Sequence, residues 1–506
     1  MRPLVPALLL VLLRPALTLT SDSLTVQTAN EAITGHLSAS HGEVIEFLGI
    51  PFAQPPINDL RWEPPQTYQG DGPYIADTDC PYTHTSLYTY PNEAGQFPSI
   101  MKAFMASEGN NSQSEDCLTL NIWTRLSTSR APKPVYVHFY GGRYTSGTTN
   151  TPFYLGAGLA SSQDIIVVTV NYRTNVFGFP GIPTLATSNL GLLDQRAAVE
   201  WLHDNIEAFG GDANRIVISG QSCGAAMVDY WAYAWPNDPI VAGLISHSGT
   251  ALSFGGNSAD LSARNWDNIT VQLGCHTTAH VLACMKRQSV SVVLIAAGKL
   301  PTSSTGTVGR TLPAFEATID NVTIFDDYEA LTSKGRFARV PYLLGHNDNE
   351  AGFYKIAVHM QGKSLTVEQW QAFNENTFTC PTDYQAAQRV RFGVSAWRFR
   401  FFADWNNTRL YPTSGAYHGV DMNMIYGNSE LFTGLPASAG QVELASRMQM
   451  AWAAFVTDPT AGLSKVGWPV FDLNNNTLIR LGYENQPDVE FVSPSIYNQA
   501  CTKSPQ

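Results

Sequence analysis

A serine between two glycines stands where an apolar run meets a helix-like segment. Its motif is GQSCG at residues 220–224, which fits the pattern G-x-S-x-G. Residues 215–219 before it have the composition of a buried parallel strand, and residues 223–235 after it have the pattern of an apolar helix. A tight turn between a strand and a helix holds a serine hydroxyl above the sheet, where it can attack a carbonyl. Ser222 is therefore the candidate nucleophile, and a turn serine without a chemical role is the alternative.

A serine hydroxyl needs a base, and the usual base is a histidine held by a carboxylate. In the strand–turn–helix context the chain order is serine, acid, histidine, with both partners in loops after strands. Beyond residue 345 the chain has three histidines, His346, His359 and His418. His346 precedes the candidate acids and His359 lies in a helix-like segment, whereas His418 lies in the glycine-flanked loop GAYHGVDM. The sequence therefore predicts His418 as the base.

The acid is expected in the polar loop GHNDNEAG, which directly follows a strand-like apolar run. Its candidates are Glu350, which we favour, and Asp348 as the second choice. Two acids in a polar loop would simply be solvated if no serine and histidine accompanied them. Together with these partners, they predict a catalytic group of Ser222, Glu350 and His418.

The developing oxyanion of an acyl transfer needs fixed N–H donors. One donor should come from the residue after the nucleophile, which is Cys223, and others from the glycine-rich turn after the strand-like run 135–140. Gly142 and Arg143 are the candidates in that turn, because glycine lets the backbone approach a substrate closely. Arg143 adds bulk and charge at this place while keeping its own N–H.

The segments around these residues alternate between strand and helix patterns. Apolar runs predict strands, and an amphipathic stretch at 189–211 that stops at paired glycines predicts a long helix. The expected strands are 118–123, 135–140, 164–173, 215–219, 243–250, 340–345 and 395–405, with a further helix at 439–457 and a short strand tail. This alternation predicts an α/β fold with a large, mostly parallel central sheet and helices on both faces. We expect residues 21–506 to form a single domain.

Two N-terminal segments have patterns of their own. Residues 24–50 alternate apolar and polar positions, which predicts antiparallel hairpins. Between Cys80 and Cys117, apolar residues recur at helical spacing from Phe97 to Met105, which predicts a short amphipathic helix. This helix is either packed on the body of the protein or part of a lid over the site.

The 506-residue composition, 44% hydrophobic and 14% charged with a net charge of −12, is ordinary for a globular enzyme. An acidic chain without basic runs argues against nucleic acid or anionic membrane surfaces as partners. No motif for a metal or cofactor is present, since there is no H-E-x-x-H and no complete phosphate loop. No stretch after the N-terminus has the roughly 18 uninterrupted apolar residues of a membrane-spanning helix.

The first twenty residues, MRPLVPALLLVLLRPALTLT, have the pattern of a secretory signal peptide. Five glycosylation sequons fit a secreted chain, at Asn110, Asn268, Asn321, Asn406 and Asn475. In an oxidising compartment most of the seven cysteines should pair, and the odd number leaves at least one thiol outside a disulfide. Cys223, beside the candidate nucleophile, is the expected one.

Several stretches together resemble one family, the type-B carboxylesterase/lipase family that includes the cholinesterases, and within it the secreted fungal members. They cover most of residues 25–460 in the family's order. The stretches are GIPFAQPP with LRWEPP, SEDCLTLNIW, YGGRYTSG, NYRTNVFGF, NLGLLDQRAAVEWLHDNIEAFGGDANRI, GQSCGAA, SHSGT, NDNEAG and AYHGVDM.

The resemblance implies an α/β-hydrolase fold with the triad Ser222, Glu350 and His418. It implies oxyanion donors at Gly142, Arg143 and Cys223, a structural ion pair between Arg61 and Glu115, and two disulfides. The implied disulfides are Cys80–Cys117 and Cys275–Cys284, while Cys380 and Cys501 have no assigned partner.

The chain departs from the family pattern at a few positions. Arg143 stands where the family has the third glycine of its turn, which favours an anionic or hydrogen-bonding acyl substrate unless the side chain points to solvent. Cys223 replaces the usual alanine, and Ala351 follows Glu350 where the family has glycine. No tryptophan lies between Cys80 and Cys117, where cholinesterases keep the one that binds choline, so choline esters are not expected.

The function that follows is a secreted serine carboxylic-ester hydrolase that works through an acyl-enzyme on a small-molecule or lipid ester, without a cofactor. The alternative is an acyltransferase, or a tailoring esterase acting on one small metabolite, with the same triad. A non-catalytic adhesion protein is a rival of another class. Such proteins usually lose a triad member and carry a membrane anchor, and this sequence keeps all three candidates and has no such anchor.

Overall fold

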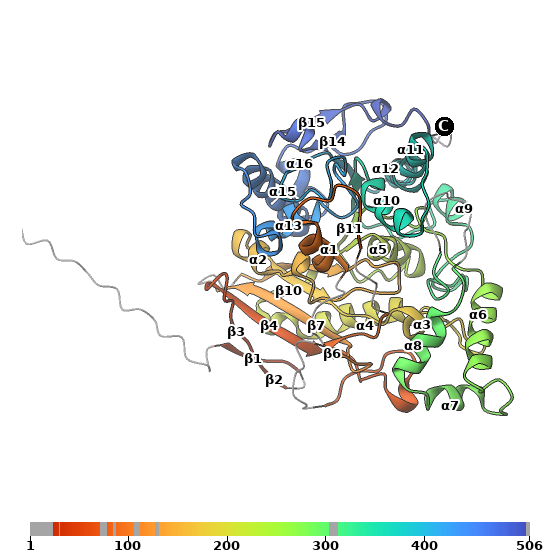
Figure 1. Ribbon diagram of the computed structural model, residues 1–506. Helices are drawn as coiled ribbons and strands as arrows, with labels where there is room; N and C mark the ends of the chain where they lie inside the picture. Colours follow the sequence, from red (N-terminus) through yellow and green to blue (C-terminus); the bar gives the residue numbers. More distant parts are fainter. Residues whose placement is uncertain are drawn as a thin grey trace, which may run out of the picture.

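An 11-stranded sheet lies at the centre of the protein, with helices on both of its faces (Figure 1). The computed structural model describes residues 24–29, 31–70, 78–83, 88–105, 112–126, 131–302 and 312–501. The predicted signal peptide, residues 1–20, and the sequon at Asn110 lie outside this part of the chain. None of the described helices is long and apolar enough to cross a membrane.

The strand order in this sheet is β15-β14-β13-β12-β11-β10-β8-β9-β7-β4-β3. In this order, the seven strands from β14 to β9, with β8 among them, run parallel to one another. The pair β14–β15 at one edge and the pairs β9–β7, β7–β4 and β4–β3 at the other are antiparallel. The bounds are β3 His36–Leu37, β4 Val44–Pro51, β7 Thr119–Arg125, β8 Lys133–Phe139, β9 Ile166–Val170, β10 Gly211–Gln221, β11 Gly243–His247, β12 Tyr342–Asn347, β13 Ala396–Phe401, β14 Leu478–Leu481 and β15 Val489–Val492. The prediction of a large, mostly parallel sheet with helices on both faces is confirmed.

Two pairs of short strands lie outside the central sheet. They are the antiparallel pair β1 Thr25–Gln27 and β2 Ala32–Thr34, and the parallel pair β5 Thr78–Asp79 and β6 Ser112–Gln113. Together with the antiparallel pairing of β3 and β4, the first pair confirms the hairpins predicted for residues 24–50.

The helices alternate with the strands along most of the chain. Their bounds are α1 Phe97–Met105, α2 Ala157–Ser162, α3 Asn175–Gly178, α4 Leu190–Asn205, α5 Cys223–Ala234, α6 Ala259–Gln272, α7 Val281–Lys286, α8 Val290–Gly298, α9 Tyr328–Ser333, α10 Ala351–Met360, α11 Val367–Asn374, α12 Cys380–Arg391, α13 Met422–Tyr426, α14 Ser429–Thr433, α15 Ala439–Thr457 and α16 Gly462–Lys465. The helix predicted at 189–211 ends earlier, at Asn205, and a 3₁₀ turn continues it to Phe209 before Gly210 adopts a φ of 83°.

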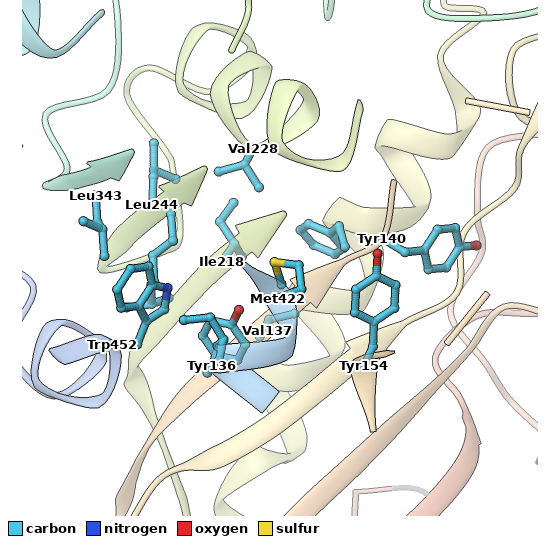
Figure 2. Packing of buried hydrophobic residues seen from close by; sticks show 14 of the residues in the cluster. Tyr136, Val137, Tyr140, Tyr154, Ile218, Val228, Leu244, Leu343, Met422 and Trp452 are labelled. Atoms are coloured by element: carbon cyan, nitrogen blue, oxygen red, sulfur yellow. The ribbon is translucent and has the colours of Figure 1, made fainter. Parts of the chain in front are cut away.

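The central strands are buried on both faces, which explains why they read as continuous apolar runs in the sequence. Every residue of β8, β9, β11 and β12 is buried. Figure 2 shows Val228 of α5 and Trp452 of α15 on opposite sides of the strands that carry Ile218 and Leu244. Both helices therefore cover the region where the candidate nucleophile leaves the sheet.

Three disulfides join the described cysteines. Two of them, Cys80–Cys117 and Cys275–Cys284, are the pairs that the resemblance implies. The third joins Cys380, at the start of α12, to Cys501. Cys223 is buried and belongs to no disulfide.

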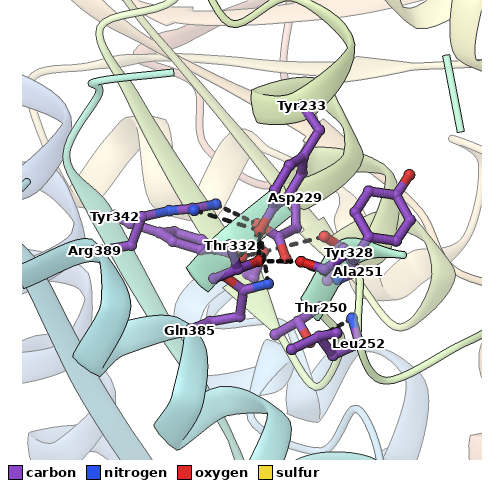
Figure 3. Close-up of polar contacts among 12 residues, drawn as sticks. Asp229, Tyr233, Thr250, Ala251, Leu252, Tyr328, Thr332, Tyr342, Gln385 and Arg389 are labelled. Carbon is purple, nitrogen blue, oxygen red and sulfur yellow. Dashed lines mark hydrogen bonds and ion pairs between the residues drawn. The ribbon is translucent and has the colours of Figure 1, made fainter. Parts of the chain in front are cut away.

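A buried ion pair joins α12 to α5 (Figure 3). Arg389 Nη2 lies 2.7 Å from Asp229 Oδ1, and neither side chain is exposed to solvent. Asp229 Oδ2 accepts a hydrogen bond of 2.8 Å from the N–H of Ala251, and the Arg389 guanidinium lies 3.8 Å from the ring centroid of Phe337. Burial raises the pKa of Asp229, although Arg389 acts in the opposite direction. The pair is stable only because each charge has its partner.

Replacing Asp229 with asparagine is expected to lower the free energy of unfolding by about 3–5 kcal/mol, because Arg389 would keep a buried charge without a counter-ion. Urea unfolding followed by tryptophan fluorescence measures this loss. The matched control is Asp238→Asn, which breaks an ion pair with Arg196 at a side chain that is 71% exposed. That change should cost about 1 kcal/mol or less. Equal losses in the two variants would contradict the prediction.

Candidate active site

Ser222 occupies a sharp turn between β10 and α5. Its backbone has a φ of 59° and a ψ of −125°, a combination that costs about 1–3 kcal/mol for a residue other than glycine. The Ser222 N–H donates to the carbonyl of His247 at the end of β11, over 2.9 Å. The Ser222 carbonyl accepts from the N–H of Ala226 in the first turn of α5. The strained conformation is thus held from both sides, by the sheet and by the helix.

The two glycines of the motif allow this turn to close. A Cβ atom on Gly220 would lie 2.3 Å from the backbone of Gly224, and a Cβ on Gly224 would lie 2.2 Å from the carbonyl oxygen of Phe139. Both distances are far inside van der Waals contact. Any side chain at these positions would therefore push α5 away from β10 or from β8.

Glu350 and His418 form a buried pair in the loops after β12 and β13. Glu350 Oε2 lies 2.5 Å from His418 Nδ1, and neither residue is more than 2% exposed. The other carboxylate oxygen, Oε1, accepts the N–H of Asn347 over 2.7 Å. Both oxygens of Glu350 are therefore committed, which fixes the plane of the carboxylate and with it the orientation of the imidazole.

The second ring nitrogen of His418 faces the nucleophile turn. Its Nε2 lies 3.1 Å from the side-chain amide nitrogen of Gln221 and 3.5 Å from the hydroxyl of Tyr354. Because an amide nitrogen can only donate, Nε2 is the acceptor, and the protonated Nδ1 donates a hydrogen bond to Glu350. In this tautomer Nε2 is able to take up a proton.

The Ser222 hydroxyl forms no hydrogen bond within the described part of the chain, although Ser222 and His418 line the same pocket. The Gln221 amide holds the position at Nε2 that the serine hydroxyl would need. Catalytic hydrogen bonds of this kind are often loose in the unliganded protein and tighten when substrate binds.

The other candidates for acid and base lie elsewhere. Asp348 pairs with Arg400 over 2.8 Å, and its side chain is 40% exposed. His346 is buried and its Nδ1 lies 3.0 Å from the carbonyl of Asn347, while the exposed His359 packs against the ring of Tyr90. Of the two candidate acids, Glu350 contacts His418 and Asp348 does not. Of the three candidate histidines, His418 is the one that pairs with Glu350.

A turn of left-handed backbone follows β8 beside Ser222. Gly142 has a φ of 129°, Arg143 of 57° and Tyr144 of 62°. For an arginine, the left-handed region costs about 1–2 kcal/mol relative to a glycine. The Gly142 carbonyl accepts from the N–H groups of Thr145 and Ser146, over 3.0 and 3.1 Å, which closes the turn. Both hydrogen bonds use the Gly142 carbonyl, and neither uses the N–H group of Gly142 or Arg143.

Cys223 ties this turn to the helix that begins after the nucleophile. Its Sγ accepts the N–H of Tyr144 over 3.2 Å. The thiol therefore links the two segments that carry the candidate oxyanion donors, Gly142 and Arg143 in the turn and Cys223 itself at the start of α5. The sequence predicts Cys223 as an oxyanion donor and as the thiol outside a disulfide, and nothing in the sequence indicates its contact with Tyr144.

A pocket of about 270 Å³ opens above Ser222 and His418. Aromatic side chains make up much of its lining, and these are Tyr88, Phe104, Tyr140, Tyr154, Phe353 and Tyr354. Phe104 belongs to α1, the helix predicted within the disulfide loop, and its ring lies 4.5 Å from that of Phe353. The segment between Cys80 and Cys117 therefore supplies part of the wall. Whether this segment moves as a lid stays a prediction.

A second buried histidine–carboxylate pair lies beneath the site and was not expected from the sequence. His247 Nδ1 lies 2.7 Å from Asp421 Oδ2, and its Nε2 accepts from the indole N–H of Trp452 over 3.1 Å. Asn347 donates from its side chain to Asp421 and to the carbonyl of Tyr417, next to His418. Through these contacts β11 and β12 fix the position of the loop that carries His418.

The structure also describes the predicted ion pair and four of the five sequon asparagines. Arg61 and Glu115 form a buried two-point ion pair with N···O distances of 2.5 and 2.7 Å. The four described sequon asparagines, Asn268, Asn321, Asn406 and Asn475, are exposed. Within the described ranges, no three His, Cys, Asp or Glu side chains are grouped so that they could hold a metal ion.

Comparison with known proteins places the chain in a family. The family model described as the carboxylesterase family matches residues 22–375. The chain is 31% identical over 480 residues to the chlorogenic acid esterase of Aspergillus niger, with 90% of each chain covered. It is 28% identical to secreted lipase 5 of Gibberella zeae, with 94% of each chain covered. It is 27% identical to an acetylcholinesterase of Bungarus fasciatus, over 95% of this chain and 86% of that one.

These matches and the 11-stranded sheet confirm the resemblance and the α/β-hydrolase fold predicted with it. The protein belongs to the carboxylesterase family and is a carboxylic-ester hydrolase.

Proposed function

We propose that this enzyme hydrolyses esters through an acyl-enzyme formed on Ser222, with His418 as the base and Glu350 as the residue that orients it. The observation that carries the proposal is the buried 2.5 Å contact between Glu350 Oε2 and His418 Nδ1. This contact places a proton on Nδ1, while the Gln221 amide donates to Nε2, so that Nε2 is an acceptor that faces the turn that holds Ser222. A histidine in that state is the base that a serine nucleophile requires.

The reaction proceeds in two halves. Ser222 Oγ attacks the ester carbonyl carbon while its proton passes to His418 Nε2. The resulting oxyanion accepts hydrogen bonds from the N–H groups of Gly142, Arg143 and Cys223. When the tetrahedral intermediate collapses, the bond to the alcohol oxygen breaks and that oxygen takes the proton from His418. A water molecule then attacks the acyl-enzyme, again giving its proton to His418, and the acid is released as Ser222 recovers its hydrogen.

Aromatic rings around His418 support its role. The ring centroids of Tyr354, Phe378 and Phe353 lie 5.1, 5.4 and 6.3 Å from that of the imidazole. Such a lining excludes water, and charges that form during the reaction interact more strongly in a dry site. Glu350 can therefore stabilise the imidazolium with little screening.

The test combines covalent labelling with a substrate series. A fluorophosphonate, which reacts with activated serines, should label Ser222 as mapped by tandem mass spectrometry, and prior labelling should abolish ester hydrolysis. Among 4-nitrophenyl esters from acetate to palmitate, we expect short chains to be hydrolysed best. A pocket of about 270 Å³ is at the lower end of the roughly 300–1,000 Å³ typical of ligand pockets. Labelling of a different residue, or no labelling of active enzyme, would overturn the proposal.

We also propose that residues 1–20 are a secretory signal peptide and that residues 21–506 form one domain. Three disulfides support export, because such bonds persist mainly in oxidising compartments, and one relative is named a secreted lipase. The intact mass of protein collected from the culture medium tests this, since a chain that retains residues 1–20 would contradict it.

A further inference from the structure

Arg143 stands at the mouth of the pocket that contains Ser222 and His418. The residue is exposed, and it is one of the residues that line the pocket. No aspartate, glutamate or lysine occurs among the lining residues that the structure describes. Arg143 therefore brings a permanent positive charge to this lining.

The backbone at this position is suited to glycine. Arg143 has a φ of 57°, in the left-handed region that side chains other than glycine seldom adopt. The neighbouring Gly142, with a φ of 129°, has the residue type that such a turn normally contains. Residues with strained backbones cluster at active sites and ligand sites, where the strain is often part of the mechanism.

The positive charge of Arg143 is opposite in sign to the net charge of the whole chain. The protein has a formal net charge of −12, so an anionic substrate is repelled by the molecule as a whole. An arginine beside the nucleophile provides a local attraction at the one place where the substrate must bind. Its planar guanidinium matches a carboxylate with two parallel hydrogen bonds, which a lysine cannot do.

We propose that Arg143 selects esters that carry a free carboxylate group in addition to the ester bond. The proposal rests on the proposed function, in which Ser222 hydrolyses the ester at the same pocket. The backbone N–H of Arg143 serves the oxyanion, and the guanidinium binds the carboxylate elsewhere in the same substrate. The aromatic lining holds the apolar part between the two groups.

The test compares esters that differ by one carboxylate. One pair places it on the acyl side, 4-nitrophenyl butyrate against mono-4-nitrophenyl succinate. The other places it on the alcohol side, phenyl acetate against 4-acetoxybenzoate. The measured quantity is the ratio of kcat/KM for the anionic ester to that for the neutral ester. In Arg143→Gln this ratio should fall about 10- to 100-fold in at least one pair, as expected for loss of a charged hydrogen bond.

Three further variants separate the effect of the Arg143 charge from the effect of backbone strain and from the effect of the protein's net charge. Arg143→Lys should keep part of the ratio because it keeps the charge. Arg143→Gly suits the left-handed backbone, so the ratio should fall in it as in Arg143→Gln without added strain. Arg447→Gln removes the same charge from a side chain that is 40% exposed on α15, outside the pocket lining, and should leave the ratio unchanged.

The outcomes are distinguishable. A ratio that stays the same in both pairs after Arg143→Gln overturns the proposal, and so does an equal fall in Arg447→Gln. If only one pair responds, the proposal holds and the carboxylate lies on that side of the ester bond. If the wild-type enzyme hydrolyses no ester of either pair and a fluorophosphonate does not label Ser222, the proposed function itself fails. Hydrolysis of the neutral esters without discrimination overturns only the role of Arg143.

Discussion

Replacing Ser222 with alanine is expected to reduce kcat for ester hydrolysis by about 10⁵- to 10⁶-fold. The hydroxyl oxygen is the only atom removed, and it is the atom that forms the acyl-enzyme. The fold should be preserved for two reasons. The Ser222 hydroxyl makes no hydrogen bond within the described part of the chain, and the backbone contacts to His247 and Ala226 do not involve the side chain.

The measurement is steady-state hydrolysis of 4-nitrophenyl butyrate by equal amounts of folded wild-type and variant enzyme. Ser219 offers a matched control on the same strand, three residues earlier. Its hydroxyl accepts a hydrogen bond from Tyr136 over 2.9 Å and lies outside the pocket lining. Ser219→Ala should cost some stability and change kcat no more than a few-fold. A Ser222→Ala enzyme with a kcat near that of the wild type would remove Ser222 as the nucleophile.

Replacing Glu350 with glutamine is expected to lower kcat by about 10⁴-fold, although the two side chains have nearly the same shape. The reason lies in the hydrogen bonds of the carboxylate. One of its oxygens accepts the N–H of Asn347, so the glutamine oxygen would occupy that place and its amide would face His418. An amide donates to Nδ1 and thereby forces the histidine proton onto Nε2. In that tautomer His418 cannot take a proton from Ser222.

The matched control is Asp348→Asn, two residues away. It removes a carboxylate that pairs with Arg400 at a half-exposed position and leaves His418 untouched. The same assay with 4-nitrophenyl butyrate should find its kcat close to that of the wild type. The reverse result, a strong loss in Asp348→Asn and little change in Glu350→Gln, would assign the acid to Asp348.

Much of the fold could be predicted because the central strands are buried on both faces and therefore read as apolar runs. The helix predicted at 439–457 coincides with α15, and the strand predicted at 215–219 lies inside β10. The helices α11 and α12 were not predicted. In α12 several inward positions are polar, among them Asp383 and Arg389, which are buried against Arg398 and Asp229. Buried ion pairs interrupt the apolar stripe on which such a prediction depends.

The pairing of Glu350 with His418 follows from chain order, because parallel strands bring their carboxyl-end loops to the same edge of the sheet. The side-chain contacts around this pair cannot be deduced from the order of the residues along the chain. Gln221 touches His418 across 197 residues of sequence, and its place in the motif carries no rule about its side chain. His247 and Asp421 are also far apart in the sequence, at 174 residues. Side-chain packing of this kind is decided by the assembled fold, so only a structure reveals it.

The disulfide between Cys80 and Cys117 has a consequence for how this family can diversify. The residues proposed for the chemistry lie in turns after β8, β10, β12 and β13, whereas Tyr88 and Phe104 of the pocket wall come from the segment that this disulfide encloses. The two ends of that segment are fixed, so its interior can accept substitutions and insertions without moving the sheet. Part of the pocket wall can therefore change while the residues proposed for the chemistry stay as they are. A change at Tyr88 or Phe104 can alter which esters fit the pocket without altering Ser222, Glu350 or His418.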